Sequence, residues 1–529
     1  MILPVLSFIV ALLLALALVP IYAKWVAVPI GLLDQPDNNR KLHSTAIPLI
    51  GGLAVFSSIL ITGIVVYFFG NIPFETPQLV LKPDDPTQFL GLLLGASFLL
   101  LVGLVDDSRG LRGRQKLLGQ IIAVGLLIAF DFRFEKMEIW GTTIEFGVFS
   151  FVVVLFWCLA VINSINLLDG ADGFAATIGI VMSLALSILA ILSERTFDAV
   201  IMLALAGSLL GFLKYNFPPA KVFLGDAGSM LIGFILAAIS IRCTLKQATT
   251  YAFFAPIALL AIPFMDTLAA IIRRKLTGRS IYSVDRGHLH HSLAKRGFGP
   301  KISLLWITLL CATTSAGGVI SMVYHQSEYA VVSMLIVAFV MVFGRLFGLA
   351  EVELVSNKAI SIGKSIVGRS RTGTESVQRS SVQLQGNRNW KEVWEELCSF
   401  ADSHDIDQIT FDINLPWLHE SFHAKRRQTG SEAASHKEYY AEIPLIVDGR
   451  IFGRVEILTN AEAKIPHYDV LANLLKLTCE FEPTLREKAA AELNTTGTSP
   501  TIPAKHDKPV VDMGGTSSDD NSPTSVLSD

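Results

Sequence analysis

Residues 89–107 read FLGLLLGASFLLLVGLVDD, an apolar run that ends at two adjacent aspartates, Asp106 and Asp107. A helix of about 20 apolar residues crosses the ~30 Å hydrocarbon core of a bilayer. Backbone groups in lipid must be hydrogen-bonded internally, so such a run predicts a helix. Similar runs fill the first 350 residues and predict an all-α polytopic membrane protein with about eleven transmembrane helices. The expected spans are 3–23, 47–69, 89–105, 117–130, 147–165, 174–193, 198–215, 230–245, 251–272, 303–324 and 329–349.

The composition supports this class and excludes others. The chain has 529 residues, of which 51% are hydrophobic and 17% are charged, and its mean hydropathy is +0.51. These values exclude a single soluble globule. A net charge of -3 gives no electrostatic footprint for nucleic acid, so we expect no nucleic-acid partner. The five cysteines form no CxxC pair and predict no chemistry.

The loops between the expected spans differ in charge, which predicts the orientation. Most lysines and arginines lie in the odd-numbered loops, so the positive-inside rule places those loops in the cytoplasm. The N-terminus is then outside, and eleven crossings leave the C-terminus inside. We expect an inner (plasma) membrane protein with a cytoplasmic active site.

The composition changes near residue 350, where the apolar runs stop. Residues 351–388 are polar and predict a linker. Helical and alternating apolar patterns within 389–492 predict a small cytoplasmic α+β domain, with Asp448-Gly449 as a hairpin turn. Within this domain, residues 440–458 resemble the end of a GAF-type sensory domain, so a regulatory partner of the domain is expected. Residues 493–529 predict a disordered tail.

One expected cytoplasmic loop carries the strongest functional signal. Residues 163–173 read NSINLLDGADG, with two asparagines and two aspartates between apolar spans and no basic residue. A turn in which Asp172 caps the next helix explains one aspartate and the glycines. It does not explain Asn163 and Asn166 at the end of an apolar span. Their amides suit a sugar, a base or a hydrated cation, which favours a functional site that also includes Asp169.

The other cytoplasmic loops are ambiguous when taken singly. The pair Asp106-Asp107 fits a solvated loop start with local salt bridges. Asp226, in the stretch 216–229 (NFPPAKVFLGDAGS), fits either a helix cap or a Mg²⁺ ligand beside substrate phosphates. Lys41 fits a solvated basic loop. The stretch 285–291 (DRGHLHH) contains three histidines without a nearby cysteine, which favours phosphate binding over zinc.

Together these loops place acidic, amide and cationic groups on the cytoplasmic side of the membrane. Phosphoryl transfer needs a metal and cations to neutralise phosphates, and in-line positioning. A site at the membrane surface suggests that one substrate is a lipid.

The ordered set of motifs resembles the polyprenyl-phosphate N-acetylhexosamine-1-phosphate transferase family, over about residues 1–350. Within it, the bacterial undecaprenyl-phosphate N-acetylglucosamine-1-phosphate transferases are most similar. The motifs are Arg40-Lys41 with Pro48 and Gly51-Gly52, Asp106-Asp107 with Lys116 and Gln120, Asn163xxAsn166xxAsp169-Gly-x-Asp172-Gly, Asn216 with Phe223-x-Gly-Asp226-x-Gly-Ser229, Pro263xxAsp266-Thr267, and Asp285-Arg286-x-His288-Leu-His290-His291. Each motif alone is unspecific, whereas six in order are very specific.

The resemblance implies a reaction and assigns roles. In this family undecaprenyl phosphate attacks the β-phosphorus of a UDP-sugar, UMP leaves, and Mg²⁺ or Mn²⁺ is required. N-acetylglucosamine is the expected sugar, for the first membrane step of cell-envelope or surface polysaccharide synthesis. The resemblance implies Asp226 and Asp107 for the metal and Asp106, Asp107, Asp169, Asp172 and His290 for catalysis. It implies Lys41, Lys116, Asn163, Asn166, Asn216, Phe223, Arg286, His288 and His291 for substrate binding.

Three alternatives stay open beside this interpretation. In the first alternative, the reaction is the same but the donor is another UDP-N-acetylhexosamine or a UDP-muramoyl-pentapeptide. Enzymes that use the muramoyl-pentapeptide donor usually carry three consecutive histidines, unlike this chain. A transporter or channel would place charges in mid-span, whereas here they lie at span ends. A degenerate family member would only anchor the C-terminal domain. A homodimer is also compatible with the sequence.

Overall fold

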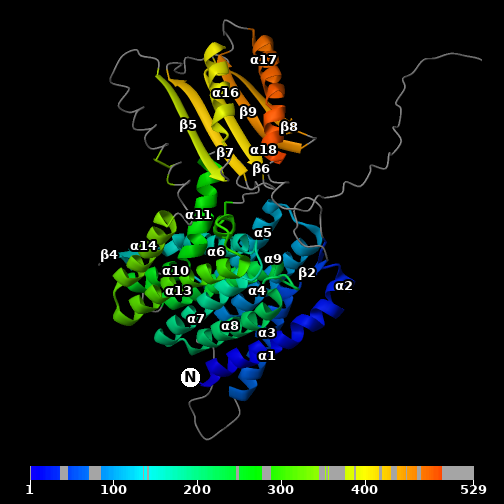
Figure 1. Cartoon of the computed structure of the whole chain (residues 1–529). Helices are drawn as coiled ribbons and strands as arrows, with labels where there is room; N and C mark the ends of the chain where they lie inside the picture. Colours follow the sequence, from blue (N-terminus) through cyan, green and yellow to red (C-terminus); the bar gives the residue numbers. More distant parts are fainter. Residues whose placement is uncertain are drawn as a thin grey trace, which may run out of the picture.

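The computed structural model describes residues 2–35, 46–70, 85–134, 136–139, 142–245, 249–276, 287–344, 352, 355–356, 376–385, 389–404, 406–415, 420–429, 438–447, 450–460 and 466–490. It consists of a bundle of long helices and a separate domain built on a β-sheet, which stands at the end of the bundle from which α11 projects (Figure 1). The bundle helices are α1 (Ile2–Trp25), α2 (Ala27–Ile30), α3 (Gly51–Gly70), α4 (Pro86–Arg109), α5 (Gly113–Ala129), α6 (Ser150–Leu168), α7 (Phe174–Leu192), α8 (Thr196–Asn216), α9 (Gly225–Leu245), α10 (Thr250–Leu259), α11 (Ala261–Leu276), α12 (Leu289–Lys295), α13 (Pro300–Tyr324) and α14 (Ser327–Phe343).

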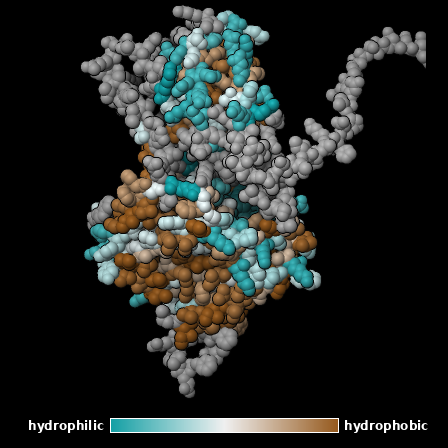
Figure 2. All heavy atoms as spheres, in the orientation of Figure 1, coloured by the Kyte–Doolittle hydropathy of each residue, from teal (hydrophilic) through white to brown (hydrophobic). Residues whose placement is uncertain are grey.

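The bundle is that of a multi-pass membrane protein. Eight helices among the described residues are long and apolar enough to cross a membrane, and the pair α10 and α11, bent by 68°, is a ninth candidate. Figure 2 shows hydrophobic residues over much of the visible face of the bundle and mainly hydrophilic ones over the sheet domain. Each expected span overlaps a helix or a helix pair among the described residues. However, α5 and α14 have only 17 residues each, so the expected count of eleven exceeds the number that meets this criterion.

Helix α9 is the centre of the bundle, because 94% of its apolar window is buried inside the protein. Glycines let neighbouring helices approach its start. A Cβ added to Gly52 at the start of α3 would lie 2.3 Å from the backbone nitrogen of Gly228. One added to Gly103 in α4 would lie 2.3 Å from the Cα of Ala227. Backbone contacts therefore fix the start of α9 against α3 and α4.

Two short antiparallel ladders depart from the purely helical prediction. Strands β1 (Leu33–Asp34) and β2 (Ile47–Pro48) pair beside α2, and β3 (Lys136–Ile139) pairs with β4 (Thr142–Glu145) ahead of the 3-10 helix η1 (Gly147–Phe149) and α6. Strand β2 takes up the start of the expected span 47–69, so that helix begins only at Gly51, whereas β3 and β4 lie in the connection ahead of the expected span 147–165. Strands of two to four residues carry too little apolar alternation to be recognised in the sequence.

A buried ion pair joins α8 and α9 at the end of the bundle opposite to the motif residues. The Nε of Arg242 donates to both carboxylate oxygens of Asp198 at 2.9 Å. Asp198 is 1% and Arg242 2% exposed. Arg242 also donates from Nη1 to the side chain of Gln88 in α4. Charges at this depth are costly unless they are paired in this way.

The C-terminal domain is α+β, as its sequence patterns predicted. Its antiparallel sheet has the order β5-β7-β6-β9-β8. The strands are β5 (Ser376–Gln385), β6 (Gln408–Leu415), β7 (Glu420–Thr429), β8 (Glu438–Val447) and β9 (Arg450–Asn460), and the helices are α16 (Lys391–Ser403), α17 (His467–Glu480) and α18 (Glu482–Ala490).

This domain has a hydrophobic core of its own, built from one face of the sheet and the helices that cover it. Phe411 of β6, for example, stacks on Trp394 of α16. The expected turn Asp448-Gly449 lies outside the described residues, although β8 and β9 pair on either side of it. Strand β5 lies within the expected linker 351–388, so the sheet domain begins earlier than the expected residue 389. Most of the remaining linker and the whole expected tail lie outside the described residues.

Candidate functional site

An acidic cluster forms where α4, α5, α6 and α9 meet. The ammonium group of Lys116, near the start of α5, lies 3.1 Å from Asp106 Oδ2 and 2.8 Å from Asp226 Oδ1. The backbone N–H of Leu111 donates to Asp106 Oδ1 at 2.7 Å. The side chain of Asp226 is 36% exposed and that of Asp106 only 7%. Asp226 is therefore the more accessible of the two carboxylates held by this lysine.

Asp107 has a different environment from its neighbour Asp106. Its Oδ1 accepts the backbone N–H of Asp226 at 2.8 Å, and its Oδ2 accepts that of Ala227 at 3.1 Å. These N–H groups belong to the first turn of α9, which has no intrahelical acceptors for them. Gly225 adopts a φ of +76°, and a Cβ there would lie 2.5 Å from Asp107 Oδ2. The end of α4 therefore caps the start of α9.

Two asparagines of α6 make different contacts. The amide of Asn166 donates to Asp226 Oδ1 and to Ser229 Oγ, so this side chain joins the acidic cluster. Asn163, one turn earlier, exchanges hydrogen bonds with the fully buried Gln120 of α5, at 2.8 Å and 3.3 Å, and also donates to the carbonyl of Leu159. Asn163 therefore connects α5 and α6 behind the cluster.

Asn216 and Asp172 hold two loops of the site together. The buried Asn216 accepts the backbone N–H of Gly173 and donates to the carbonyl of Val222, both at 2.9 Å. Asp172 accepts the backbone N–H of Ala220 at 2.9 Å. The loop after α6 is thereby fixed to the loop after α8.

Phe223 and the glycines that begin α3 form a second connection near the start of α9. The backbone N–H of Phe223 donates to the carbonyl of Pro48 at 2.9 Å, and its carbonyl accepts the N–H of Gly51 at 3.0 Å. Leu49 and Phe223 form a parallel bridge. The side chain of Phe223 stays partly exposed, so it can contact a ligand.

Asp169 follows the last residue of α6, where the helix dipole disfavours a negative charge. Burial and the charge of Asp226 raise the pKa of Asp169 well above its ordinary range, and Asp107 adds to the effect. The loop thus holds a carboxyl group that resists ionisation. A carboxyl group with a raised pKa is a candidate for general acid or base chemistry.

The histidine segment lies against this loop. A Cβ added to Gly170 would lie 3.4 Å from the His290 ring, which also meets the ring of Phe174 edge-on with a centroid distance of 5.5 Å. His290 is 6% exposed and neither ring nitrogen has a hydrogen-bond partner among the described residues. Burial lowers the pKa of His290 to about 4, so its ring is neutral at physiological pH.

The other two histidines flank this buried ring. The ring of His288 is parallel to that of His290, with 6.1 Å between the ring centroids. The partly exposed His291 has its ring centroid 4.1 Å from that of His290. Nδ1 of His288 lies 2.7 Å from Oδ2 of Asp266, which is fully buried in α11.

The structure therefore brings most of the predicted site residues to one end of the bundle. Lys41 and Arg286 lie outside the described residues. Gln120, Ser229 and Asp266 belong to the motifs but were not among the predicted site residues. The sequence marks them only as polar residues within apolar helices, and this observation becomes informative once their partners are known.

The donor set of the acidic cluster fits a hard cation such as Mg²⁺. Within the described ranges, no group of three or more histidine, cysteine, aspartate or glutamate side chains could hold a metal ion. Mg²⁺ does not require one, since it usually takes one or two carboxylates, several waters and substrate phosphates. The carboxylates of Asp106 and Asp226 already meet around one positive charge, that of Lys116.

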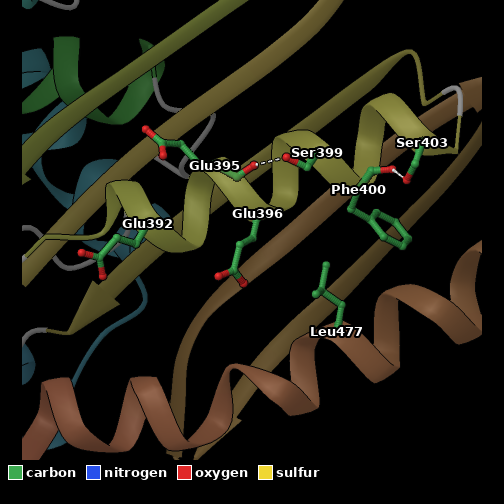
Figure 3. Close-up of a pocket in the computed structure, with 7 residues that line it drawn as sticks. All are labelled: Glu392, Glu395, Glu396, Ser399, Phe400, Ser403 and Leu477. Atoms are coloured by element: carbon green, nitrogen blue, oxygen red, sulfur yellow. Dashed lines mark hydrogen bonds between the residues drawn. The ribbon is translucent and has the colours of Figure 1, made fainter.

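A hollow in the C-terminal domain lies apart from these motifs. Glu392, Glu395, Glu396, Ser399, Phe400 and Ser403 of α16 line it together with Leu477 of α17 (Figure 3). It is open and acidic, and it contains none of the predicted site residues.

Comparison with known proteins agrees with the motifs and the geometry. Residues 89–244, which contain the acidic cluster, match the model of glycosyl transferase family 4. A probable undecaprenyl-phosphate N-acetylglucosaminyl 1-phosphate transferase of Bacillus subtilis is 32% identical over 308 residues, covering 58% of this chain and 81% of the relative. A decaprenyl-phosphate N-acetylglucosaminephosphotransferase of Mycobacterium tuberculosis is 32% identical over 332 residues, covering 58% and 80%.

A third relative extends the agreement to another bacterial group. The undecaprenyl-phosphate alpha-N-acetylglucosaminyl 1-phosphate transferase of Escherichia coli is 29% identical over 327 residues, covering 60% of this chain and 84% of the relative. Membership of a transferase family also decides against the transporter or channel alternative. The chain belongs to glycosyl transferase family 4, among the polyprenyl-phosphate N-acetylhexosamine-1-phosphate transferases.

Proposed function

We propose that the protein transfers N-acetylglucosamine-1-phosphate from UDP-N-acetylglucosamine to undecaprenyl phosphate. An oxygen of the lipid phosphate bonds to the β-phosphorus of the nucleotide sugar. The bond from that phosphorus to the bridging oxygen breaks, and UMP leaves with the electron pair. The observation that carries this proposal is the cluster of Asp106, Asp226, Lys116 and Asn166 at one end of a bundle of membrane helices. The names of the relatives support the sugar and the lipid.

The contacts divide the site residues into two groups. Asp226, Asn166, Asp169 and Phe223 have partly exposed side chains, so we assign them to substrate and catalysis. Asp107, Asn163 and Asp172 are partly exposed as well, but they and the buried Asn216 bind backbone groups or Gln120 of a neighbouring element, so we assign them to holding the first group in place. Lys116 neutralises Asp106 and Asp226 and can also attract a phosphate.

We propose Mg²⁺ or Mn²⁺ as the cofactor, held by Asp226 together with substrate phosphates. When bound, such an ion stabilises the negative charge that develops on the transferred phosphoryl group. Asp226 is favoured as the protein ligand because its side chain is the most exposed carboxylate around Lys116. Both oxygens of Asp107 already accept backbone N–H groups, which makes it a support for Asp226 and not the principal ligand.

We further propose eleven crossings of the inner membrane, with the N-terminus outside and the motif end of the bundle in the cytoplasm. The helices α5 and α14 and the bent pair α10 and α11 then each count as a crossing. The concentration of lysine and arginine in loops at one side supports this orientation. The product would begin a cell-envelope or surface polysaccharide, and the C-terminal domain would serve regulation or partner binding.

The test is a transfer assay on membranes that contain the full-length protein. Radiolabelled UDP-N-acetylglucosamine and undecaprenyl phosphate are supplied with Mg²⁺, and the lipid-linked label is counted. Parallel reactions use UDP-N-acetylgalactosamine or a UDP-muramoyl-pentapeptide as the donor. Matched membranes carrying Asp226→Asn correct for endogenous transferases.

The proposal requires label in the lipid that depends on the lipid acceptor, a divalent cation and Asp226, with UMP released in equal amount. Label only with another donor would change the sugar and keep the reaction class. Absence of lipid-linked label with every donor, in membranes with normal protein abundance, would refute the proposal.

A further inference from the structure

Asp266 is a fully buried carboxylate that touches the histidine segment from a different element. It lies in α11, just beyond the bend of 68° that separates α11 from α10. Its Oδ2 lies 2.7 Å from Nδ1 of His288, and its Oδ1 accepts the backbone N–H of Leu289 at 2.8 Å. We propose that Asp266 is a positioning residue that acts through His288 and presents this ring to the phosphates of the nucleotide sugar. The inference rests on the function proposed above.

The burial of Asp266 indicates a specific arrangement. Its exposed fraction is 0%, and a buried carboxylate is costly unless its oxygens accept hydrogen bonds. Here both oxygens contact consecutive residues of one segment, a side chain at His288 and a backbone N–H at Leu289. Two contacts fix both the position of the segment and the rotation of the ring, which a single contact would not do.

The same contact favours one tautomer of His288. Because a carboxylate oxygen accepts hydrogen bonds, we assign the hydrogen between Asp266 and the ring to Nδ1. The other ring nitrogen, Nε2, points away from Asp266 because the two nitrogens lie on opposite sides of the ring. Pairing one imidazole nitrogen with a carboxylate is a common way to orient the other toward a ligand.

The position of His288 is transmitted to the loop of Asp169. The His288 ring lies parallel to that of His290, with an angle of 3° between them. His290 in turn approaches Gly170, the residue after Asp169. Asp266 therefore supports a continuous set of contacts from α11 to the loop that carries the catalytic carboxyl group.

A matched control is available at the other end of the bundle. Asp198 is also a buried carboxylate with a cationic partner, Arg242, and it lies outside the acidic and histidine clusters. Replacing Asp198 by Asn removes a comparable buried charge without touching the histidine segment. It therefore reports the cost of losing a buried ion pair as such.

The experiment uses the full-length protein and a double-mutant cycle of Asp266→Asn and His288→Gln, with Asp198→Asn as the control. We expect Asp266→Asn to lower kcat/KM for UDP-N-acetylglucosamine by about 10- to 100-fold, the usual scale for losing a supporting partner. In the His288→Gln background the same change should cost less than about 2-fold, since its effect passes through that ring. Asp198→Asn should leave kcat/KM unchanged.

Hydrogen exchange of the purified protein gives a second measurement that needs no turnover. Asp266→Asn should speed exchange in the peptide that spans 288–295, while Asp198→Asn should not. Independent, multiplicative effects in the cycle, or unchanged exchange in this peptide, would overturn the proposal. If the wild type transfers no sugar phosphate, the proposed function fails, and the exchange measurement still decides whether Asp266 positions the segment.

Discussion

The backbone N–H of Asp226 donates a hydrogen bond to Oδ1 of Asp107, which lies 119 residues earlier in the chain. The residue that supports a ligand of the proposed cation is thus contributed by a different helix. Because α9 begins at Gly225 and is preceded by Leu224, neither residue offers a side-chain oxygen to cap the helix, and the carboxylate from α4 takes that role.

Asp107→Asn is expected to impair both activity and stability. An asparagine amide accepts only through its single oxygen, so the N–H of either Asp226 or Ala227 would face the NH2 group of the new side chain and lose its acceptor. We expect turnover to fall at least ~10²-fold, the scale of a lost electrostatic group, and the melting temperature in detergent to fall as well. Asp106→Asn should lose as much turnover and less stability, because the cap remains. If both variants keep most of their activity, the pair is only a solvated helix end.

Asp226→Asn is expected to abolish transfer and leave the fold intact. The cap of α9 comes from Asp107, and Lys116 keeps its ion pair with Asp106. The variant should reach the membrane in normal amount and melt near the wild-type temperature, yet produce no lipid-linked label. Adding Mn²⁺ or excess Mg²⁺ should not restore it. Near-normal turnover at equal expression would rule out a metal-binding role.

Asp169→Asn is expected to stabilise the protein while it inactivates the enzyme. The folded state raises the pKa of Asp169, so stability is lost as the pH rises from about 4 through the raised value. An amide does not ionise, and the melting temperature above neutral pH should increase by a few degrees, since ~1 kcal/mol shifts a large domain by roughly 2–4 °C. Turnover should fall at least ~10²-fold. A lower melting temperature in the variant at pH 8 would contradict this account.

His290→Gln is expected to change how stability depends on pH. The pKa of His290 in the folded protein is about 4, which is below its value in the unfolded chain. The stability linked to this difference is therefore fully present above about pH 6.5 and is lost as the pH falls toward 4. The difference between the folded and unfolded pKa values corresponds to about 3 kcal/mol in the free energy of unfolding. Melting curves of both proteins between pH 4.5 and 7.5 are the measurement. The wild type should lose more stability on acidification than the variant, and parallel curves would show that this ring ionises normally.

Truncation after Gly348 is expected to leave transfer intact. The sheet domain has a separate hydrophobic core, and no residue of the acidic or histidine clusters lies in it. The truncated chain should appear in membranes and label undecaprenyl phosphate at a rate within about 3-fold of the full chain. Changes that are far from a site and share no contacts with it usually have small effects on it. Cysteine-accessibility mapping of the tail beyond residue 494 in intact cells tests the cytoplasmic placement. Loss of all activity in a stably inserted truncation would assign part of the chemistry to the domain.

The sequence predicted the helices of the bundle well, because apolar runs of this length have few structural solutions. It was less informative about the ends and bends of those helices. The run 251–272 contains two helices that meet at 68°, and Pro256 and Pro263 are its only local signals. The criterion of length also excludes α5 and α14, because each has 17 residues.

For the site, the sequence located the residues without distinguishing their tasks. Asp106 and Asp107 are adjacent and chemically identical, yet one binds Lys116 and the other caps α9. Asn163 and Asn166 differ in the same way, because one turn of helix directs them to different partners. Such differences depend on contacts between helices distant in the chain, which no local pattern contains.

The enclosure of α9 has a consequence for how the protein is made. Because 94% of its apolar window is covered by protein, this helix has almost no surface for lipid and carries Asp226 and Arg242 near its two ends. It is also synthesised after α3, α4, α6 and α7, which surround it. A nascent α9 thus gains little by partitioning into acyl chains on its own and gains most by entering a space that its predecessors have already formed. Biogenesis of the catalytic centre is therefore expected to be sequential, with assembly of the earlier helices preceding the stable insertion of the helix that completes it.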